Sequence, residues 1–307
     1  MKDRIITLLL IVLLWSSDNF VQDRFESRQL TFDQAQNGFA SWSPDGKSIV
    51  YQYIDMRGDT LGKNGLWINL FDGKEARQVF KGIAEHPKWS PDGKFIVFDA
   101  DTGNSIKMIA VESGNIIDFL PDSTHIQNGG LPCWSPDGSQ IAFLERKGLS
   151  LCIYKMKTGD VKSIFSKEGM LPLPGCWSID GKYILVALSD KKTRKSTMWK
   201  ISVDGKMQEQ IHGHHENFWR HMTLSPDGSL LVYAAMEEKY MGLWIMLAEG
   251  SKSIPLAVTP NAHNEGAFWS PDGTHIAFNS TRSGNFDVWV MDVDPETLKL
   301  ELKELNK

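Results

Sequence analysis

One short turn motif recurs six times along this chain of 307 residues, and its spacing constrains the fold more than any other feature. Each copy joins the turn to an apolar segment: ASWSPDGKSIVY begins at Ala40, PKWSPDGKFIVF at Pro87, PCWSPDGSQIAF at Pro132, GCWSIDGKYILV at Gly175, MTLSPDGSLLVY at Met222 and AFWSPDGTHIAF at Ala267. Successive copies lie 43 to 47 residues apart. A period of about 40 to 50 residues is typical of propeller blades or of paired helices.

The pattern inside each copy distinguishes these two architectures. The segment after every turn is rich in Val, Ile, Phe and Tyr, which favours strands. SPDG places Pro, Asp and Gly where a tight turn between antiparallel strands needs them. A third strand-like segment follows, such as LCIYKM at Leu151, and then a short fourth, such as VKSIF at Val161. The sequence therefore predicts an all-β fold, a six-bladed β-propeller of four-stranded antiparallel blades.

The strand count also predicts how the ring closes. SRQLTF at Ser27 resembles a fourth strand with no blade before it, whereas the last blade ends on a third strand at Asp287 to Asp292. Pairing these two ends would close the ring and remove exposed strand edges. LKLELKEL at Leu298 is the alternative candidate for the same edge.

The tryptophans fit this arrangement. Five of the eleven directly precede the Ser of the turn, where we expect them to pack as wedges between blades: Trp42, Trp89, Trp134, Trp177 and Trp269. Trp219 lies outside the repeat pattern, and we expect it to be exposed and to serve a different purpose.

The first residues have the pattern of a secretory signal. Lys2 and Arg4 precede an apolar run from Ile5 to Trp15, which is too short to span a bilayer. We therefore expect residues 1–20 to be a signal peptide, residues 24–307 to form the propeller, and the exported protein to be periplasmic or secreted. After cleavage no transmembrane anchor is expected.

Charge and cysteine content exclude two further classes. The net charge is −5 and no long basic run offsets it, so nucleic acid is not an expected partner. Three cysteines are too few for a disulfide scaffold in a chain of this length. We expect a monomer.

At these motifs the chain resembles the TolB-type propeller repeat, whose hallmark is a WSPDG turn followed by a strand like IAF. It departs at Ile179, which replaces the turn Pro, and at Leu224, which replaces the Trp. We expect no counterpart of the additional domain that precedes the propeller of TolB itself. The resemblance implies a periplasmic or secreted module that receives a peptide or protein at the mouth of its channel. Related propellers also include metal-dependent oligosaccharide lyases, which supply an enzymatic alternative.

Loop lengths indicate which face carries function. The SPDG turns and the turns after the third strands share one face and are tight, whereas the blade-to-blade crossings share the other face and vary in length. The crossing from Ile211 to His221 holds four of the eight histidines. In this crossing His212, His214 and His221 are candidate ligands for a divalent metal such as Mn, Zn or Ca, the alternative being that the loop histidines are simply solvated.

The alignment of the repeats predicts a second group of candidate site residues, at the mouth of the channel on this same variable face. His86 and His221 each stand three residues before the Trp or Leu anchor, in blades two and five, which face each other in a six-membered ring. The neighbouring positions add further polar groups, giving a predicted ligand site of Glu85, His86, Trp219, Arg220, His221, Asn264 and Glu265. An exposed Trp and an Arg suit a peptide, a protein or a cell-envelope glycan. The alternative is that Arg220 only pairs with Glu265 or Glu85. No cofactor is expected for such a binding module.

Overall fold

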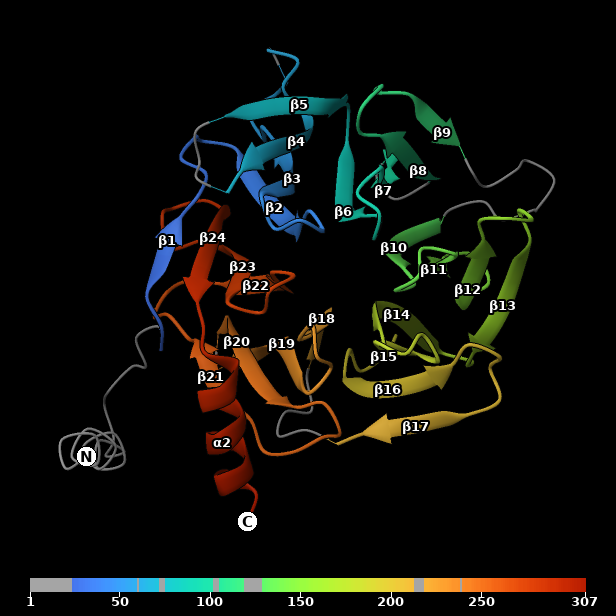
Figure 1. Ribbon diagram of the computed structural model, residues 1–307, viewed down its shortest axis with the longest axis vertical. Coiled ribbons are helices and arrows are strands. Elements are labelled where there is room, and N and C mark those ends of the chain that lie inside the picture. The colour runs from blue at the N-terminus through green and yellow to red at the C-terminus, as the bar shows by residue number, and fades with distance from the viewer. Residues whose placement is uncertain are drawn as a thin grey trace.

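A computed structural model describes residues 24–59, 61–71, 75–101, 105–118, 129–212, 218–237 and 239–307, with the backbone alone for 218–220. It contains six four-stranded antiparallel sheets arranged around a central channel (Figure 1). The predicted six-bladed propeller is therefore confirmed. Among the helices of the described part, none is long and apolar enough to cross a membrane.

The strands follow one another from the channel outward in each of the first three blades. Blade 1 contains β2 (Gln36–Trp42), β3 (Ser48–Ile54), β4 (Gly65–Leu70) and β5 (Ala76–Lys81). Blade 2 contains β6 (Ala84–Trp89), β7 (Phe95–Ala100), β8 (Ser105–Ala110) and β9 (Ile116–Asp118). Blade 3 contains β10 (Gly129–Trp134), β11 (Gln140–Glu145), β12 (Ser150–Lys155) and β13 (Val161–Ser166).

The next two blades repeat this order, and the last takes its outer strand from the other end of the chain. Blade 4 contains β14 (Met170–Trp177), β15 (Tyr183–Asp190), β16 (Ser196–Ser202) and β17 (Gln208–Ile211). Blade 5 contains β18 (Phe218–Leu224), β19 (Leu230–Glu237), β20 (Tyr240–Leu247) and β21 (Ile254–Ala257). Blade 6 contains β22 (Asn264–Trp269), β23 (His275–Ser280), β24 (Asp287–Asp292) and β1 (Ser27–Gln29).

Closure of the ring by the N-terminal strand is confirmed. β1 pairs antiparallel with β24, with Ser27 opposite Met291. The contact continues beyond the strand, since Thr31 Oγ1 donates to the buried Asp287 carboxylate at 2.8 Å. The last blade therefore joins both ends of the chain.

The alternative that LKLELKEL forms the closing strand is wrong, because this segment belongs to helix α2 (Pro295–Leu305). Asp294 caps the helix by accepting from the backbone N–H of Glu296 and Thr297. Leu298 and Leu302, four residues apart, are fully buried, whereas Leu300 between them is exposed. The helix pattern thus overrides an alternation of Leu and charged residues that also suits a strand.

The SPDG turns form a continuous ring on one face. In blade 4, Ser178 Oγ donates to Asp180 Oδ1 at 2.7 Å and accepts from the Tyr183 N–H at 3.0 Å, and corresponding bonds recur in the other five turns. Gly181 has a φ of +69°, which Gly adopts without strain. The ring of each turn Pro lies beside the turn Gly of the next blade, as Pro44 does beside Gly93. We call this side of the molecule the turn face.

The tryptophans next to these turns link neighbouring blades. Trp177 is buried, and its Nε1–H donates to the Cys133 carbonyl of the preceding blade at 3.1 Å. Trp42 and Trp134 make the same bond to their preceding blades at 3.2 Å. Trp89 is only half-buried, and its Nε1–H has no hydrogen-bond partner among the described residues. The wedges therefore differ in how firmly they hold adjacent blades together.

Candidate functional site

Each inner strand carries one residue at the same register, three positions before its Trp or Leu anchor, and these six residues line the channel. They are Phe39, His86, Leu131, Pro174, His221 and Gly266. Four of them have a left-handed backbone, with φ of +50° at Phe39, +51° at His86, +56° at Leu131 and +63° at Gly266. Each of these four lies in a β-bulge, which bends the strand and redirects the side chain.

Three of these side chains meet near the channel axis. The Phe39 ring lies 4.2 Å from His86 and 5.0 Å from His221, and the two imidazole centroids are 5.4 Å apart. His86 is 5% exposed and His221 is 6% exposed. We call Phe39, His86 and His221 the central cluster. Side chains from blades 1, 2 and 5 thus meet at this level.

A buried carboxylate orients His86. Asp99 is fully buried on β7, and its Oδ2 lies 3.0 Å from His86 Nδ1 while its Oδ1 accepts from the Leu131 N–H at 2.8 Å. Arg146 Nη2 lies 3.8 Å from the same carboxylate. His86 Nδ1–H therefore donates to Asp99, and Nε2 is directed away from it. Nε2 is buried and has no hydrogen-bond partner among the described residues.

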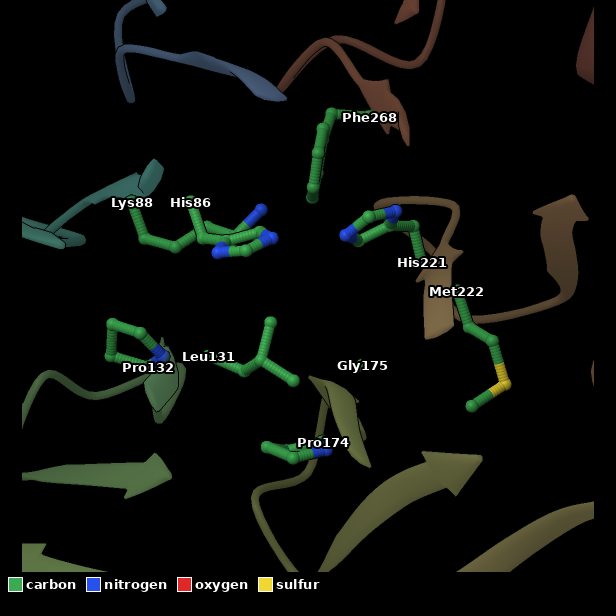
Figure 2. Close-up of a pocket in the computed structure, with 9 residues that line it drawn as sticks. All are labelled: His86, Lys88, Leu131, Pro132, Pro174, Gly175, His221, Met222 and Phe268. Atoms are coloured by element: carbon green, nitrogen blue, oxygen red, sulfur yellow. The ribbon is translucent and has the colours of Figure 1, made fainter. Parts of the chain in front are cut away.

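A small cavity lies beside the central cluster, as Figure 2 shows with its lining residues. Its free volume is about 20 Å³, enough for one water molecule. His86 and Lys88 enter it from β6, and His221 stands opposite (Figure 2). Lys88 Nζ lies 3.0 Å from the centre of the Phe268 ring, a cation–π contact. Burial lowers the pKa of Lys88 to about 7.

The remaining residues of the predicted ligand site lie in different surroundings. Glu85 and Glu265 are half-buried, each next to a residue of the channel lining. Asn264 is fully buried, its Oδ1 accepting from Arg282 Nη2 at 2.9 Å and its Nδ2 donating to Thr259 at 3.2 Å. It therefore stabilises blade 6. The backbone of Trp219 and Arg220 belongs to β18, and their side chains lie outside the described residues.

Of the three candidate metal ligands, the structure describes His212 and His221, which lie on different blades. His212 is exposed and follows β17, the outermost strand of blade 4, whereas His221 is buried on β18, the innermost strand of blade 5. His214 lies outside the described residues. The described part of the chain contains no group of three His, Cys, Asp or Glu side chains that could hold a metal ion.

Sequence reasoning missed four residues that shape the site. Phe39 occupies the same register as His86 and His221, and Lys88 and Phe268 each directly precede a repeat Trp. Counting back from the anchor in every blade would have found these three. Asp99 lies in a different strand, and its pairing with His86 follows from the β6–β7 register.

Comparison with known proteins supports the architecture. No family model matches the chain. An uncharacterised protein of Agrobacterium fabrum is 27% identical over 116 residues, which cover 38% of this chain and 39% of that protein. The match thus spans well under half of either protein, and it defines no family.

Solved structures share the fold over most of their length. A TolB-like protein of Agrobacterium tumefaciens has a TM-score of 0.63 and 19% identity, over 87% of this chain and 94% of its own. Oligogalacturonate lyase of Vibrio parahaemolyticus has a TM-score of 0.62 and 12% identity, over 91% and 97%. The chain therefore has the propeller architecture common to these proteins. At such identities the likeness concerns the fold alone.

Proposed function

We propose that this chain is an exported binding module that recognises a peptide, a protein segment or a cell-envelope glycan. The ligand would bind at the channel mouth on the face that carries the blade-to-blade crossings, which we call the crossing face. Export rests on the signal-like first residues, and the binding role rests on the site and on the likeness to TolB-like propellers.

The observation that carries this proposal is the convergence of three aromatic rings, from blades 1, 2 and 5, on the channel axis. A ligand that enters the channel from the face with the blade-to-blade crossings would meet this central cluster. Glu85 and Glu265 each directly precede a channel-lining residue, and Trp219 and Arg220 directly precede His221.

The residue types at this mouth suit recognition of an extended ligand. A Trp can stack on a sugar ring or an aromatic side chain, and the fork of an Arg can hold a carboxylate in two hydrogen bonds. Anchors of these types often contribute about 2 kcal/mol or more to binding. Variable crossings on a rigid propeller would then set specificity.

A screen of peptides and glycans by thermal shift, followed by calorimetry with the Trp219→Ala, Arg220→Ala double variant, tests this proposal. We expect the double variant to melt normally and to bind the selected ligand at least about 30-fold more weakly. Lys182→Ala, Lys206→Ala is the matched control, because both side chains are exposed on the turn face. Unchanged affinity in the Trp219, Arg220 variant would exclude this mouth.

The same preparation tests the enzymatic alternative. Stoichiometric Mn, Zn or Ca, together with oligosaccharide cleavage that a chelator abolishes, would replace the binding module with a metal-assisted lyase. Ligand binding that is insensitive to the chelator would support the binding module.

A further inference from the structure

The guanidinium of Arg146 lies at the channel mouth and makes no hydrogen bond with any described residue. Arg146 follows β11, in the loop between the second and third strands of blade 3, and this loop lies on the crossing face. Its side chain is 38% exposed, and Nη2 lies 3.8 Å from the buried Asp99 carboxylate, too far for a hydrogen bond. Its Nε is buried without a partner in the described part of the chain. The donors of this group therefore remain available to a ligand.

A glycine of the inner strand makes room for this guanidinium. Gly130 lies on β10 directly before Leu131, which lines the channel. A Cβ added at Gly130 would lie 2.6 Å from Arg146 Nη2 and 3.0 Å from Arg146 Nε, closer than a side chain can approach. The head group of Arg146 therefore occupies the space of a side chain at position 130.

This space belongs to a level of the channel that is one residue nearer the crossing face than the lining. In the other blades, register gives this level to Gly38, Glu85, Leu173, Arg220 and Glu265. Arginines thus hold the level in blades 3 and 5, on either side of Leu173 in blade 4, whereas glutamates hold it in blades 2 and 6. The half of the mouth formed by blades 3 to 5 is therefore the half that attracts an anionic group.

We propose that Arg146 binds the carboxylate of an acidic side chain in a peptide segment that enters the mouth. This proposal rests on the proposed function and names the class of its ligand. A guanidinium holds a carboxylate through two parallel hydrogen bonds, which its unpartnered donors can supply. Asp99 does not take up these donors, because its Oδ1 already accepts from the Leu131 N–H and its Oδ2 from His86 Nδ1.

Exposed apolar side chains on the same face favour a peptide over a glycan. Met56 and Leu61 lie between β3 and β4, Ile83 lies in the crossing between β5 and β6, and Met236 lies near the end of β19. All four are exposed. Apolar side chains of a peptide would remove this surface from water, whereas sugar hydroxyls would not.

Selection of phage-displayed random peptides on the whole protein tests the proposal. We expect peptides selected on the wild-type protein to be enriched in Asp or Glu, and peptides selected on Arg146→Gln to lack this enrichment. Arg77→Gln is the matched control, because Arg77 is exposed on β5, the outermost strand of blade 1. It should select the same acidic peptides as the wild-type protein.

The most enriched peptide is then synthesised in two forms, with its acidic residue and with the corresponding amide. The wild-type protein should bind the acidic form at least about ten-fold more tightly, and Arg146→Gln should bind both forms equally. A loss of stability alone does not change this ratio, since both peptides are measured on the same protein. If Arg146→Gln does not fold, Arg146→Lys keeps the charge beside Asp99 but lacks the fork, and it should discriminate several-fold less than the wild type.

The outcomes separate this inference from the proposed function. Equal discrimination in wild type and the Arg146 variants would overturn the role of Arg146. Selected peptides without acidic residues that lose affinity in the Trp219→Ala, Arg220→Ala variant would also overturn it, but would keep the mouth as the binding site. Binding of glycans alone would overturn the peptide ligand. Acidic peptides that depend on Arg146 but not on Trp219 and Arg220 would support Arg146 and contradict the proposed anchors.

Discussion

The two faces of this propeller are built from the same six inner strands, yet they differ in how strictly they repeat. On the turn face, each blade uses the same bonds among Ser, Asp and the following strand, and each turn rests on its neighbour. On the crossing side, the equivalent channel positions hold Phe39, His86, Leu131, Pro174, His221 and Gly266. The sequence repeat is therefore strict on the turn face, where it holds neighbouring blades together. It is not kept at the channel positions, where side chains from different blades meet.

The largest predicted loss of stability follows from removing the strand that closes the ring. Deleting residues 26–32 removes β1 and the buried Leu30, whose loss alone should cost about 2–5 kcal/mol. It also exposes the edge of β24. Thermal unfolding followed by circular dichroism should show a markedly lower melting temperature. A melting temperature equal to that of the full chain would contradict closure by β1.

The next effect compares two wedges of the turn face. Trp177→Ala should cost about 3–5 kcal/mol in the free energy of unfolding, because the ring is buried and its N–H bonds to blade 3. Trp89→Ala should cost less, since Trp89 is half-buried and lacks that bond within the described part of the chain. Urea denaturation measures both, and a larger loss for Trp89→Ala would show that the hydrogen bond is not what distinguishes them.

A smaller effect concerns how the melting temperature depends on pH in acid. Hydrogen bonds from Ser178 and the Lys182 N–H lower the pKa of Asp180 from 3.8 to about 2. A lowered pKa stabilises the folded state above pH 3.8, and this contribution disappears as pH falls through about 2. The melting temperature of Asp180→Asn should therefore depend less on pH between these values. Glu168→Gln, which changes an exposed carboxyl in a loop, is the control and should keep the wild-type dependence on pH. Identical pH profiles for Asp180→Asn and wild type would exclude this role for the turn carboxylates.

The smallest predicted effect comes from restoring Pro to the turn of blade 4, where Ile179 replaces it. Ile179→Pro should stabilise the protein by about 0.4–1 kcal/mol, because Pro restricts the unfolded chain and five equivalent turns already accept it. The turn of blade 4 makes the same hydrogen bonds as the others. Calorimetric melting measures the difference, and destabilisation would mean that the backbone at Ile179 differs from that of its counterparts.

The blades and their closure could be predicted because each depends on local patterns that recur along the chain. The strand count alone predicts that SRQLTF closes the ring, and its first three residues, Ser27–Gln29, form the strand that pairs with β24. LKLELKEL could not be assigned, since its alternation suits both a strand and a helix, and its cap at Asp294 and the burial of Leu298 decided the outcome.

The site was only partly predictable for a different reason. Register was enough to pair His86 with His221 across the ring. The surroundings of Lys88 come from Phe268, Cys133 and Cys176, which lie on three other blades. The positive φ of His86 arises in a bulge that the repeat pattern does not record.

Backbone hydrogen–deuterium exchange with and without a ligand selected in the screen tests most directly whether the crossing face carries function. Bound ligand should slow exchange in residues 82–86 and 218–221, at the channel mouth, and leave the turn at residues 178–181 and its five equivalents unchanged. Slower exchange confined to the turns, with no change at the mouth, would contradict the division of the molecule into a scaffold face and a binding face.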